Sequence, residues 1–198
     1  MRPQFAILAC GWLAAAGLSG CAAWPGKAVT PAVAQSRQGL YQLQAWKLEG
    51  RIGAKVGDEG WSANLFWEHE GGQDRLRIAG PFSQGAVSII VQSDLVYVNE
   101  GKGVVTLSRE PDDWLKKRLG FTVPLRSLRY WVLGLPAPDA EYKAVLDAAG
   151  GLAGFEQQGW AVAFDGFGSA GGFVLPKKMS VRGGAATLKL IADEWILK

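Results

Sequence analysis

The chain has 198 residues, of which 48 % are hydrophobic and 20 % are charged, so it can form a packed core and disorder is not expected. The formal net charge is only +3, which disfavours a protein built to bind nucleic acid or another polyanion. One His and two Cys disfavour metal sites, histidine-based catalysis and small disulfide scaffolds. Nine Trp is a high count for this length and calls for an explanation.

The N-terminal segment has the features of an export signal. An apolar run from Phe5 to Gly17 follows Arg2 and is too short to span a bilayer as a helix, which needs roughly 20 residues. The run ends in Leu18-Ser19-Gly20-Cys21, which resembles the lipobox of bacterial lipoproteins; the alternative is a plain signal peptide with a chance Cys. We therefore expect a signal peptide over 1–20, lipidation of Cys21 and a flexible tether over 21–35. By resemblance to enterobacterial sorting rules, Ala22 favours the outer membrane.

The remaining residues, 36–198, are predicted to form one domain rich in β-strands. A short helix is expected over 36–44, and from Trp46 onward apolar and polar residues alternate. This period of two is typical of antiparallel strands with one apolar and one wet face, joined by short turns. Strands are expected over 46–55, 61–68, 75–78, 87–92, 95–98, 104–107, 160–164, 179–181, 188–190 and 194–197.

Two further helices are expected within this run of strands. The segment 110–119 begins with acidic residues and Pro111, and the segment 124–133 begins with Pro124 and ends just before Gly134. Leu125, Leu128 and Trp131 form one apolar stripe of the second helix. The expected fold class is therefore mostly β (α+β): a curled antiparallel sheet of about ten or eleven strands, covered or filled by about three helices. The Gly-rich stretch 165–172 is expected to be a flexible hairpin loop.

None of the candidate motifs in the sequence indicates catalysis or cofactor binding. Gly166-x-Gly168-x-x-Gly171 matches a dinucleotide-binding pattern, but the sequence that follows does not predict the helix that the pattern requires. The only His, His69, ends a strand between two Glu and is interpreted as a surface residue. The pair Asp112 and Asp113 falls in a helix first turn, where acidic side chains favour the helix dipole. We expect no enzyme activity, no cofactor and no metal site.

Two apolar features remain. An inward aromatic stripe (Trp46, Trp61, Trp67, Trp131, Trp160, Phe164) is by default core, but a curled sheet of this size also has room for a lipid-sized ligand. Such a cavity is expected to be lined by Trp46, Leu48, Ile52, Leu65, Trp67, Ile78, Val87, Ile89, Leu128 and Trp131.

The second feature is Phe82, which stands between Pro81 and Ser83 in a Gly-flanked hairpin loop. It is either a chance surface residue or a side chain that enters a membrane.

Several strings resemble the LolB family of outer-membrane lipoprotein receptors. They run in the expected order over essentially the whole mature chain: Cys21 in its lipobox, Trp46-x-Leu48-x-Gly50-Arg51-Ile52, Leu65-Phe66-Trp67, Gly80-Pro81-Phe82, Val123-Pro124-Leu125-x-Ser127-Leu128-x-x-Trp131-Val132-Leu133-Gly134-Leu135-Pro136 and Leu190-Ile191-Ala192-Asp193-Glu194-Trp195.

The resemblance implies an unclosed antiparallel barrel, covered by helices, with a hydrophobic cavity. It further implies a lipid-anchored receptor at the periplasmic face of the outer membrane. Such a receptor accepts lipoproteins from the periplasmic carrier LolA and inserts them into that membrane through a loop with an apolar tip, here Pro81, Phe82 and Ser83. We expect a monomer without a nucleic-acid partner. Two rival interpretations remain: a lipid-anchored enzyme, and an anchored lipid-binding or interaction module with no transfer role. Either an acidic or a basic rim could face the carrier.

Overall fold

The computed structural model describes residues 37–80, 85–93, 95–101, 105–109, 112, 116, 121–122 and 124–198. The predicted signal peptide, Cys21 and the tether lie outside the described residues, and so do Pro81, Phe82 and Ser83 of the predicted membrane loop. Most of the helix predicted over 110–119 also lies outside them.

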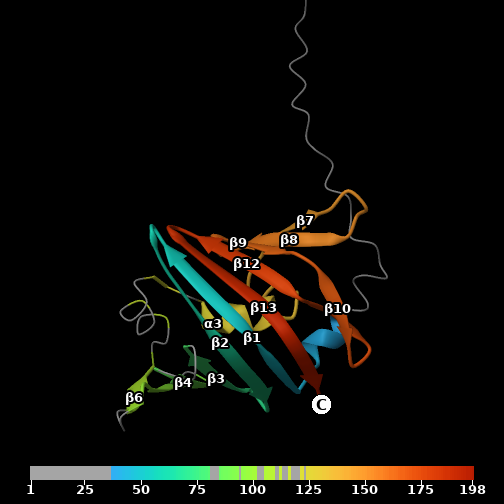
Figure 1. Cartoon of the computed structure of the whole chain (residues 1–198). Coiled ribbons are helices and arrows are strands. Elements are labelled where there is room, and N and C mark those ends of the chain that lie inside the picture. The colour runs from blue at the N-terminus through green and yellow to red at the C-terminus, as the bar shows by residue number, and fades with distance from the viewer. Residues whose placement is uncertain are drawn as a thin grey trace, which may run out of the picture.

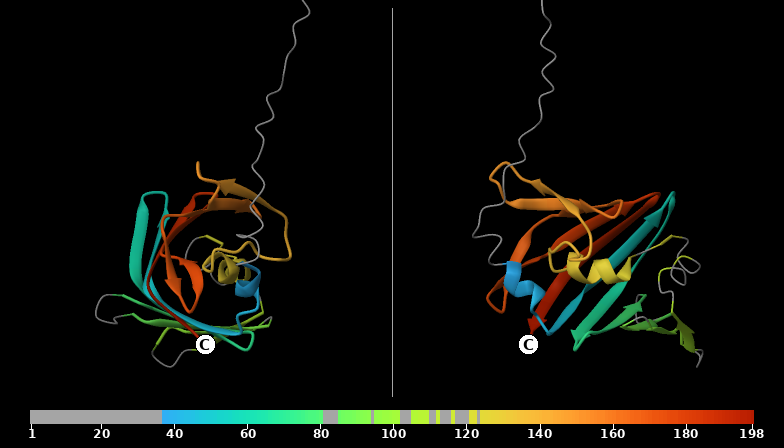
Figure 2. Two further views of the ribbon diagram at one scale, coloured as in Figure 1. Left: turned by 90° about the vertical axis from the view of Figure 1, so that its right-hand side faces the viewer. Right: turned by 180° about the vertical axis from the view of Figure 1, so that it is seen from behind.

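A single antiparallel sheet of 11 strands dominates the fold (Figure 1). Its strand order is β6-β5-β4-β3-β2-β1-β13-β12-β9-β8-β7, so β6 and β7 stand at its two ends. Figure 2 shows the sheet curving round on itself, as predicted for an unclosed barrel. The strands are β1 (Ala45–Val56), β2 (Glu59–Glu70), β3 (Gln73–Ala79), β4 (Val87–Gln92), β5 (Leu95–Asn99), β6 (Val105–Ser108), β7 (Tyr142–Leu146), β8 (Leu152–Gln157), β9 (Trp160–Phe164), β12 (Lys178–Gly183) and β13 (Ala186–Leu197).

The centre of the sheet is made by β1, β2 and β13, each 12 residues long. The pairing of β1 with β13 shifts register between Glu49 and Gly50. At Gly50 the two backbones approach so closely that an added Cβ would overlap the carbonyl oxygen of Ile191. A glycine is therefore required at this point of the β1 sequence, because only it lets the bulged strands meet.

Helix α3 (Leu125–Trp131) lies inside the ring of strands (Figure 2). Its predicted apolar stripe is confirmed, since Leu125, Leu128 and Trp131 are buried. The turn that follows the helix closes at Gly134, whose φ of +80° lets the amide of Leu135 donate to the carbonyl of Tyr130 at 3.1 Å. This left-handed helix end is the one that a Gly just past the last turn predicts.

Fewer helices are described than the three predicted. Residues 37–41 form a helical turn, shorter than the predicted helix over 36–44, and α3 is a second helix. Asp112 and Lys116, the described residues of the segment 110–119, are also helical.

Three predictions about the C-terminal half were wrong. Strands β7 and β8 were not foreseen, and the two strands expected over 188–190 and 194–197 are one continuous strand, β13. The Gly-rich stretch is not a loop: β10 (Phe167–Ala170) pairs with β11 (Phe173–Pro176) in a separate two-stranded sheet. Gly171 and Gly172 both have positive φ, the conformation that a two-residue hairpin turn requires.

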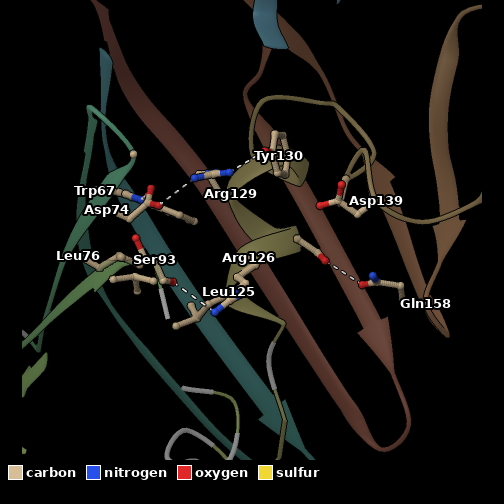
Figure 3. Close-up of a pocket in the computed structure, with 14 residues that line it drawn as sticks. Trp67, Asp74, Leu76, Ser93, Leu125, Arg126, Arg129, Tyr130, Asp139 and Gln158 are labelled. Atoms are coloured by element: carbon tan, nitrogen blue, oxygen red, sulfur yellow. Dashed lines mark hydrogen bonds and ion pairs between the residues drawn. The ribbon is translucent and has the colours of Figure 1, made fainter. Parts of the chain in front are cut away.

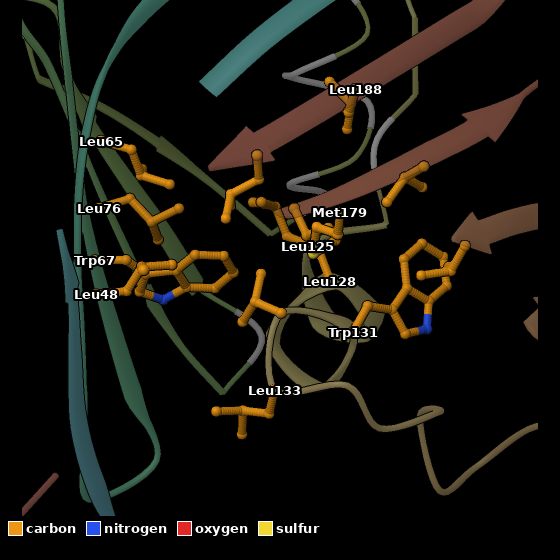
Figure 4. Packing of buried hydrophobic residues seen from close by; sticks show 14 of the residues in the cluster. Leu48, Leu65, Trp67, Leu76, Leu125, Leu128, Trp131, Leu133, Met179 and Leu188 are labelled. Atoms are coloured by element: carbon orange, nitrogen blue, oxygen red, sulfur yellow. The ribbon is translucent and has the colours of Figure 1, made fainter. Parts of the chain in front are cut away.

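One continuous apolar core fills the space between α3 and the sheet (Figure 4). Side chains from β1, β2 and β3 meet those from α3, β12 and β13, including Leu48, Leu65, Leu128 and Met179. The prediction that Trp61 joins this core was wrong, because its side chain is 38 % exposed. Trp61 lies at the start of β2, close to the β1–β2 turn, where the first four residues of β2 are all exposed.

Among the residues that the structure describes, no helix combines the length and the hydropathy needed to cross a bilayer.

Candidate functional site

The predicted cavity residues come together inside the barrel. Seven of the ten are buried: Trp46, Leu48, Leu65, Trp67, Ile89, Leu128 and Trp131. The other three, Ile52, Ile78 and Val87, are partly buried and pack against the same core. The alternation along β1, β2, β3 and β4 thus brings residues far apart in sequence onto one apolar inner surface.

Two aromatic groups stand on this inner surface. The ring of Trp46 lies 5.5 Å from the rings of both Trp67 and Trp195. On the other side, the ring of Trp131 lies 6.4 Å from those of Phe155 and Trp160. Aromatic pairs at such separations stabilise a core by about 0.5–1.5 kcal/mol beyond their area burial. Trp131 belongs to helix α3, so the helix itself contributes an aromatic side chain to the second group.

A cluster of buried polar side chains lies beside the first aromatic group, the one around Trp46. The carboxylate oxygen Oδ1 of Asp74 accepts a hydrogen bond from Nε1 of Trp67 at 2.9 Å, and Nδ1 of His69 lies 3.0 Å from the same oxygen. His69 is only 8 % exposed and stacks on Trp46 at 5.6 Å. The interpretation of His69 as a surface residue was therefore wrong. It occupies an inward position of β2, in phase with Leu65 and Trp67.

Arg129 connects α3 to the buried carboxylate of Asp74. Its Nη1 atom lies 3.7 Å from Oδ2 of Asp74, and its Nη2 atom donates to the hydroxyl of Tyr130 at 2.6 Å. The guanidinium also lies 4.6 Å from the centroid of the Tyr130 ring. One edge of α3 is thus held to β3 by a charge pair that is only partly exposed.

Gln157 at the end of β8 holds the opposite edge of α3. Its side-chain oxygen accepts from Nε1 of Trp131 and from the amide of Ala137, both at 2.8 Å. Its side-chain nitrogen donates to the carbonyls of Ala137 and Ala140, also at 2.8 Å. A fully buried amide that makes four hydrogen bonds fixes both the helix and the segment after it.

A pocket of about 410 Å³ opens between α3 and the ends of the strands (Figure 3). Apolar side chains such as Trp67, Leu76 and Leu125 form part of its wall, while Arg129 and Asp139 make another part polar. A second pocket of about 220 Å³ lies on the far side of Arg129 and Tyr130, against Trp46 and His69. Both pockets are bordered by Arg129, Tyr130 and Gly72, so these residues stand between the two.

The helical turn over 37–41 borders the second pocket. The hydroxyl of Tyr41 donates to the carbonyl of Pro136 at 2.8 Å, and Nη1 of Arg37 donates to the carbonyl of Gly134 at 3.2 Å. Burial raises the pKa of Tyr41 to about 12, and neighbouring Tyr142 adds to this rise. Burial also lowers the pKa of Arg37. These contacts connect the start of the domain to the segment after α3.

The sequence analysis overlooked several of these polar residues. Asp74 shares the inward phase of Leu76 and Ile78, so a carboxylate on an apolar face was visible in the sequence. Gln157 gave no such signal, because β8 itself was not predicted. No cluster of three or more His, Cys, Asp or Glu suited to a metal ion occurs in the described part of the chain.

Comparison with known proteins now gives the family. A sequence profile described as outer membrane lipoprotein LolB matches residues 44–195. The chain belongs to the LolB family. Outer-membrane lipoprotein LolB of Pseudomonas paraeruginosa is 30 % identical over 184 residues, which cover 90 % of this chain and 90 % of that protein. The LolB of Stutzerimonas stutzeri is 31 % identical over 185 residues, covering 90 % of this chain and 89 % of that one.

Solved structures agree with this LolB assignment at the level of the fold. A LolA superfamily protein from Nitrosomonas europaea superposes with a TM-score of 0.51 and 10 % identity, over 79 % of this chain and 87 % of that one. A putative outer membrane lipoprotein-sorting protein domain from Vibrio parahaemolyticus gives a TM-score of 0.51 and 9 % identity, over 84 % and 91 % of the two chains. The predicted LolB-family fold, an unclosed antiparallel barrel, is confirmed.

Proposed function

We propose that this chain is a lipid-anchored receptor of the outer membrane that accepts lipoproteins from a LolA-like periplasmic carrier. It holds their acyl chains in its apolar interior and inserts them into the membrane. The observation that carries the proposal is the continuous apolar inner surface of an open barrel in a chain of the LolB family. An anchored lipid-binding or interaction module with no transfer role is the alternative.

The physical need for such a receptor follows from the cost of exposing lipid. An acyl chain in water costs about 0.8 kcal/mol per CH₂, so a lipoprotein does not cross the periplasm unaided. A receptor with an apolar interior gives the acyl chains a second binding site away from water, after that of the carrier. Transfer of this kind makes and breaks no covalent bond, and we therefore propose no enzyme activity and no cofactor.

The apolar side chains of α3 occupy the space that acyl chains would need. Leu125, Leu128 and Trp131 are buried against the sheet, so bound chains replace some of their contacts. We infer that such chains enter at the two pockets beside Arg129, because the buried Trp67 borders one of them and the buried Trp46 borders the other. Acyl chains therefore bind by displacing α3 outward, away from the strands.

The anchor and the membrane loop are proposed from the sequence. Lipidation of Cys21 holds the chain at the periplasmic face of the outer membrane, with 21–35 as the tether and 36–198 as the receptor domain. Two or more acyl chains give a stable anchor. Pro81, Phe82 and Ser83 form the loop that enters the bilayer, since Phe82 is apolar and stands between β3 and β4.

Cargo acceptance tests the receptor proposal. The purified chain is mixed with a complex of LolA and a lipoprotein, and the lipoprotein on each protein is measured after separation. We expect transfer to the chain, and a strong reduction in Leu128→Glu, which places a charge in the interior. Val174→Glu is the matched control, because Val174 is exposed on β11. If the chain binds a lipopeptide but takes none from the carrier, the binding-module alternative is correct.

The loop is tested separately with Phe82→Glu and, as a conservative control, Phe82→Leu. We expect Phe82→Glu to accept cargo from the carrier and to fail in passing it to vesicles, whereas Phe82→Leu does both. Unchanged delivery by Phe82→Glu would show that the loop has no role in membrane entry.

A further inference from the structure

The outer surface of the sheet near β6 is unusual for a face turned to water. Residues of β3 to β6 that point inward, such as Ile89 and Val96, are buried in the core. The alternate residues therefore point outward. Cross-strand pairing aligns them in two rows, and we call this surface the outer apolar face: Arg75, Ile90, Tyr97 and Leu107 in one row, and Arg77, Ser88, Asn99 and Val105 in the other.

Large apolar side chains on this face are open to solvent. Val105 and Leu107 are 59 % and 58 % exposed, and Tyr97, which pairs directly with Leu107, is 37 % exposed. A single exposed apolar residue needs no explanation, but neighbouring ones on one sheet face indicate a contact surface. An antiparallel sheet that faces water normally carries polar residues on its outer side.

The charges on this face have one sign. At the outward positions of the described parts of β3, β4, β5 and β6, arginine is the charged residue type, and neither Asp nor Glu occurs. By contrast, β1, β2 and β13 carry opposite charges in pairs, such as Lys47 with Glu68 at 2.9 Å and Arg51 with Asp193 at 2.9 Å. The sheet therefore has two outer surfaces of different chemistry.

Charged side chains of both signs gather where the two surfaces meet. Glu68 lies within 4 Å of three cations: Lys47 at 2.9 Å, Lys198 at 3.7 Å and Arg75 at 3.8 Å. The hydrogen bond from Lys47 lowers the pKa of Glu68 and so keeps it ionised. The pKa of Lys47 is raised by that hydrogen bond and by the charges of Glu70 and Glu49. The guanidinium of Arg77 lies 6.0 Å from the centroid of the Phe66 ring.

A shallow groove connects the cationic and apolar parts. It has a volume of about 400 Å³ and is bordered on one side by Arg75, Arg77 and Ile90. Its other side includes Phe66 and the charged residues Lys47, Glu49 and Glu68. Apolar side chains with arginines beside them match the boundary between the headgroups and acyl chains of a bilayer, where anionic phosphates attract basic side chains. Figure 2 shows β3 to β6 together along one side of the molecule, so this surface can approach a plane.

We propose that the outer apolar face rests on an anionic phospholipid bilayer, with Val105 and Leu107 in the interfacial layer and Arg75 and Arg77 at lipid phosphates. The proposal rests on the proposed function in one respect, since the anchor at Cys21 holds the domain beside a membrane. It adds to that function a defined orientation of the barrel. Strands β3 and β4, which carry part of this face, also flank the proposed membrane loop.

Lipid photo-crosslinking tests this orientation in the anchored protein. The processed chain is reconstituted into vesicles of phosphatidylethanolamine and phosphatidylglycerol (3:1), with a benzophenone amino acid at position 107 or, as control, at position 174. Leu107 and Val174 are 58 % and 62 % exposed, so both sites are equally open to solvent. We expect at least fivefold more lipid adduct from position 107, as measured by mass spectrometry. Equal yields from the two positions overturn the proposal.

A charge-matched pair of variants tests the role of the arginines. Arg75→Gln with Arg77→Gln removes two positive charges from the outer apolar face, and Lys55→Gln with Lys189→Gln removes two from the outer surface of β1 and β13. Because basic residues near an anionic surface are attracted to its phosphates, the first pair should lower the adduct yield at position 107 at least threefold and the second should leave it unchanged. Equal effects overturn the proposal.

Cargo acceptance from the carrier, measured on the same proteins, keeps the two proposals apart. If the arginine variant accepts cargo normally but loses lipid adducts, both proposals stand. If no protein accepts cargo while position 107 still labels lipid, only the receptor function fails. If position 107 instead crosslinks to the carrier and not to lipid, the face binds protein and the bilayer proposal is wrong.

Discussion

The indole nitrogen of Trp67 donates a hydrogen bond of 2.9 Å to Oδ1 of Asp74, inside the largely apolar barrel. Asp74 is only 6 % exposed, and Nδ1 of His69 and Nη1 of Arg129 also face its carboxylate. The sheet thereby presents a carboxylate to the helix inside it. This connection between β3 and α3 must break when α3 moves outward, as the proposed function requires.

Loss of the Asp74 carboxylate should destabilise the domain. In Asp74→Ala, the buried Trp67 donor and the Arg129 cation lose their acceptor, which costs about 3 kcal/mol. We expect Asp74→Asn to lose less, because its side-chain oxygen still accepts from Trp67. Urea unfolding followed by Trp fluorescence gives both values. Equal losses for the two variants would mean that the charge, not the acceptor, matters.

Gln157 should be the most important polar side chain for the position of α3. Gln157→Leu leaves Nε1 of Trp131, both backbone groups of Ala137 and the carbonyl of Ala140 without their partner, and we expect a loss of about 3 kcal/mol or more. The neighbouring Gln158→Leu removes one hydrogen bond, to Ser127, and should cost about 1 kcal/mol. The free energies of unfolding in urea decide between these expectations.

The β1–β13 bulge should not tolerate a side chain at Gly50. An added methyl group would overlap the Ile191 carbonyl, so Gly50→Ala must push apart two of the three longest strands of the sheet. We expect a loss of about 3 kcal/mol or more, visible as a large drop in Tm. Gly53→Ala on the same strand is the control, since its added Cβ would lie 3.4 Å from the Trp61 carbonyl oxygen, an ordinary contact. Similar Tm values for the two variants would refute this reading.

Tyr41 should make stability depend on pH in the alkaline range. Burial raises its pKa in the folded state to about 12, whereas the unfolded value is near 10. The protonated phenol therefore stabilises the fold fully below about pH 10, and this contribution is lost as the pH rises towards 12. Tyr41→Phe should be less stable than the parent at neutral pH by about 1 kcal/mol, the value of its hydrogen bond to Pro136.

Chemical unfolding of the parent and Tyr41→Phe at several pH values between 8 and 11 checks this prediction. The difference in unfolding free energy should be constant at the lower values and shrink as the pH rises above about 10. A difference that grows with pH contradicts the sign of the pKa shift.

Much of the N-terminal half of the sheet could be predicted from the sequence. The alternation along β1, β2, β3 and β4 is local, because successive side chains of a strand point to opposite faces. The end of α3 was predictable for the same kind of reason, since Gly134 supplies the left-handed residue that closes the helix. The resemblance to the LolB family rested on these same local strings and is confirmed.

The errors lie where local pattern and tertiary environment disagree. Trp61 has the inward phase of Leu65 and Trp67, but it lies close to the β1–β2 turn, where the first four residues of β2 are all exposed. His69 looked like a surface residue between two Glu, but its phase and the Asp74 carboxylate bring it inside. The stretch 165–172 was predicted to be a loop, but β10 and β11 pair as a hairpin there. Two consecutive glycines with positive φ form the tight turn between these strands.

The sequence by itself determined the strand periodicity, the capped helix of the interior and the family, because each depends on residues close together in the chain. Only the tertiary structure decided which polar side chains hold α3, and that the outer surface of β3 to β6 combines exposed apolar residues with arginine as its charged residue type. Those features depend on the register between strands and on contacts across the barrel, such as Arg129 with Asp74 and Trp131 with Gln157. The residue pattern of a single strand does not specify which strand will pair with it or which side chains it will contact across the barrel.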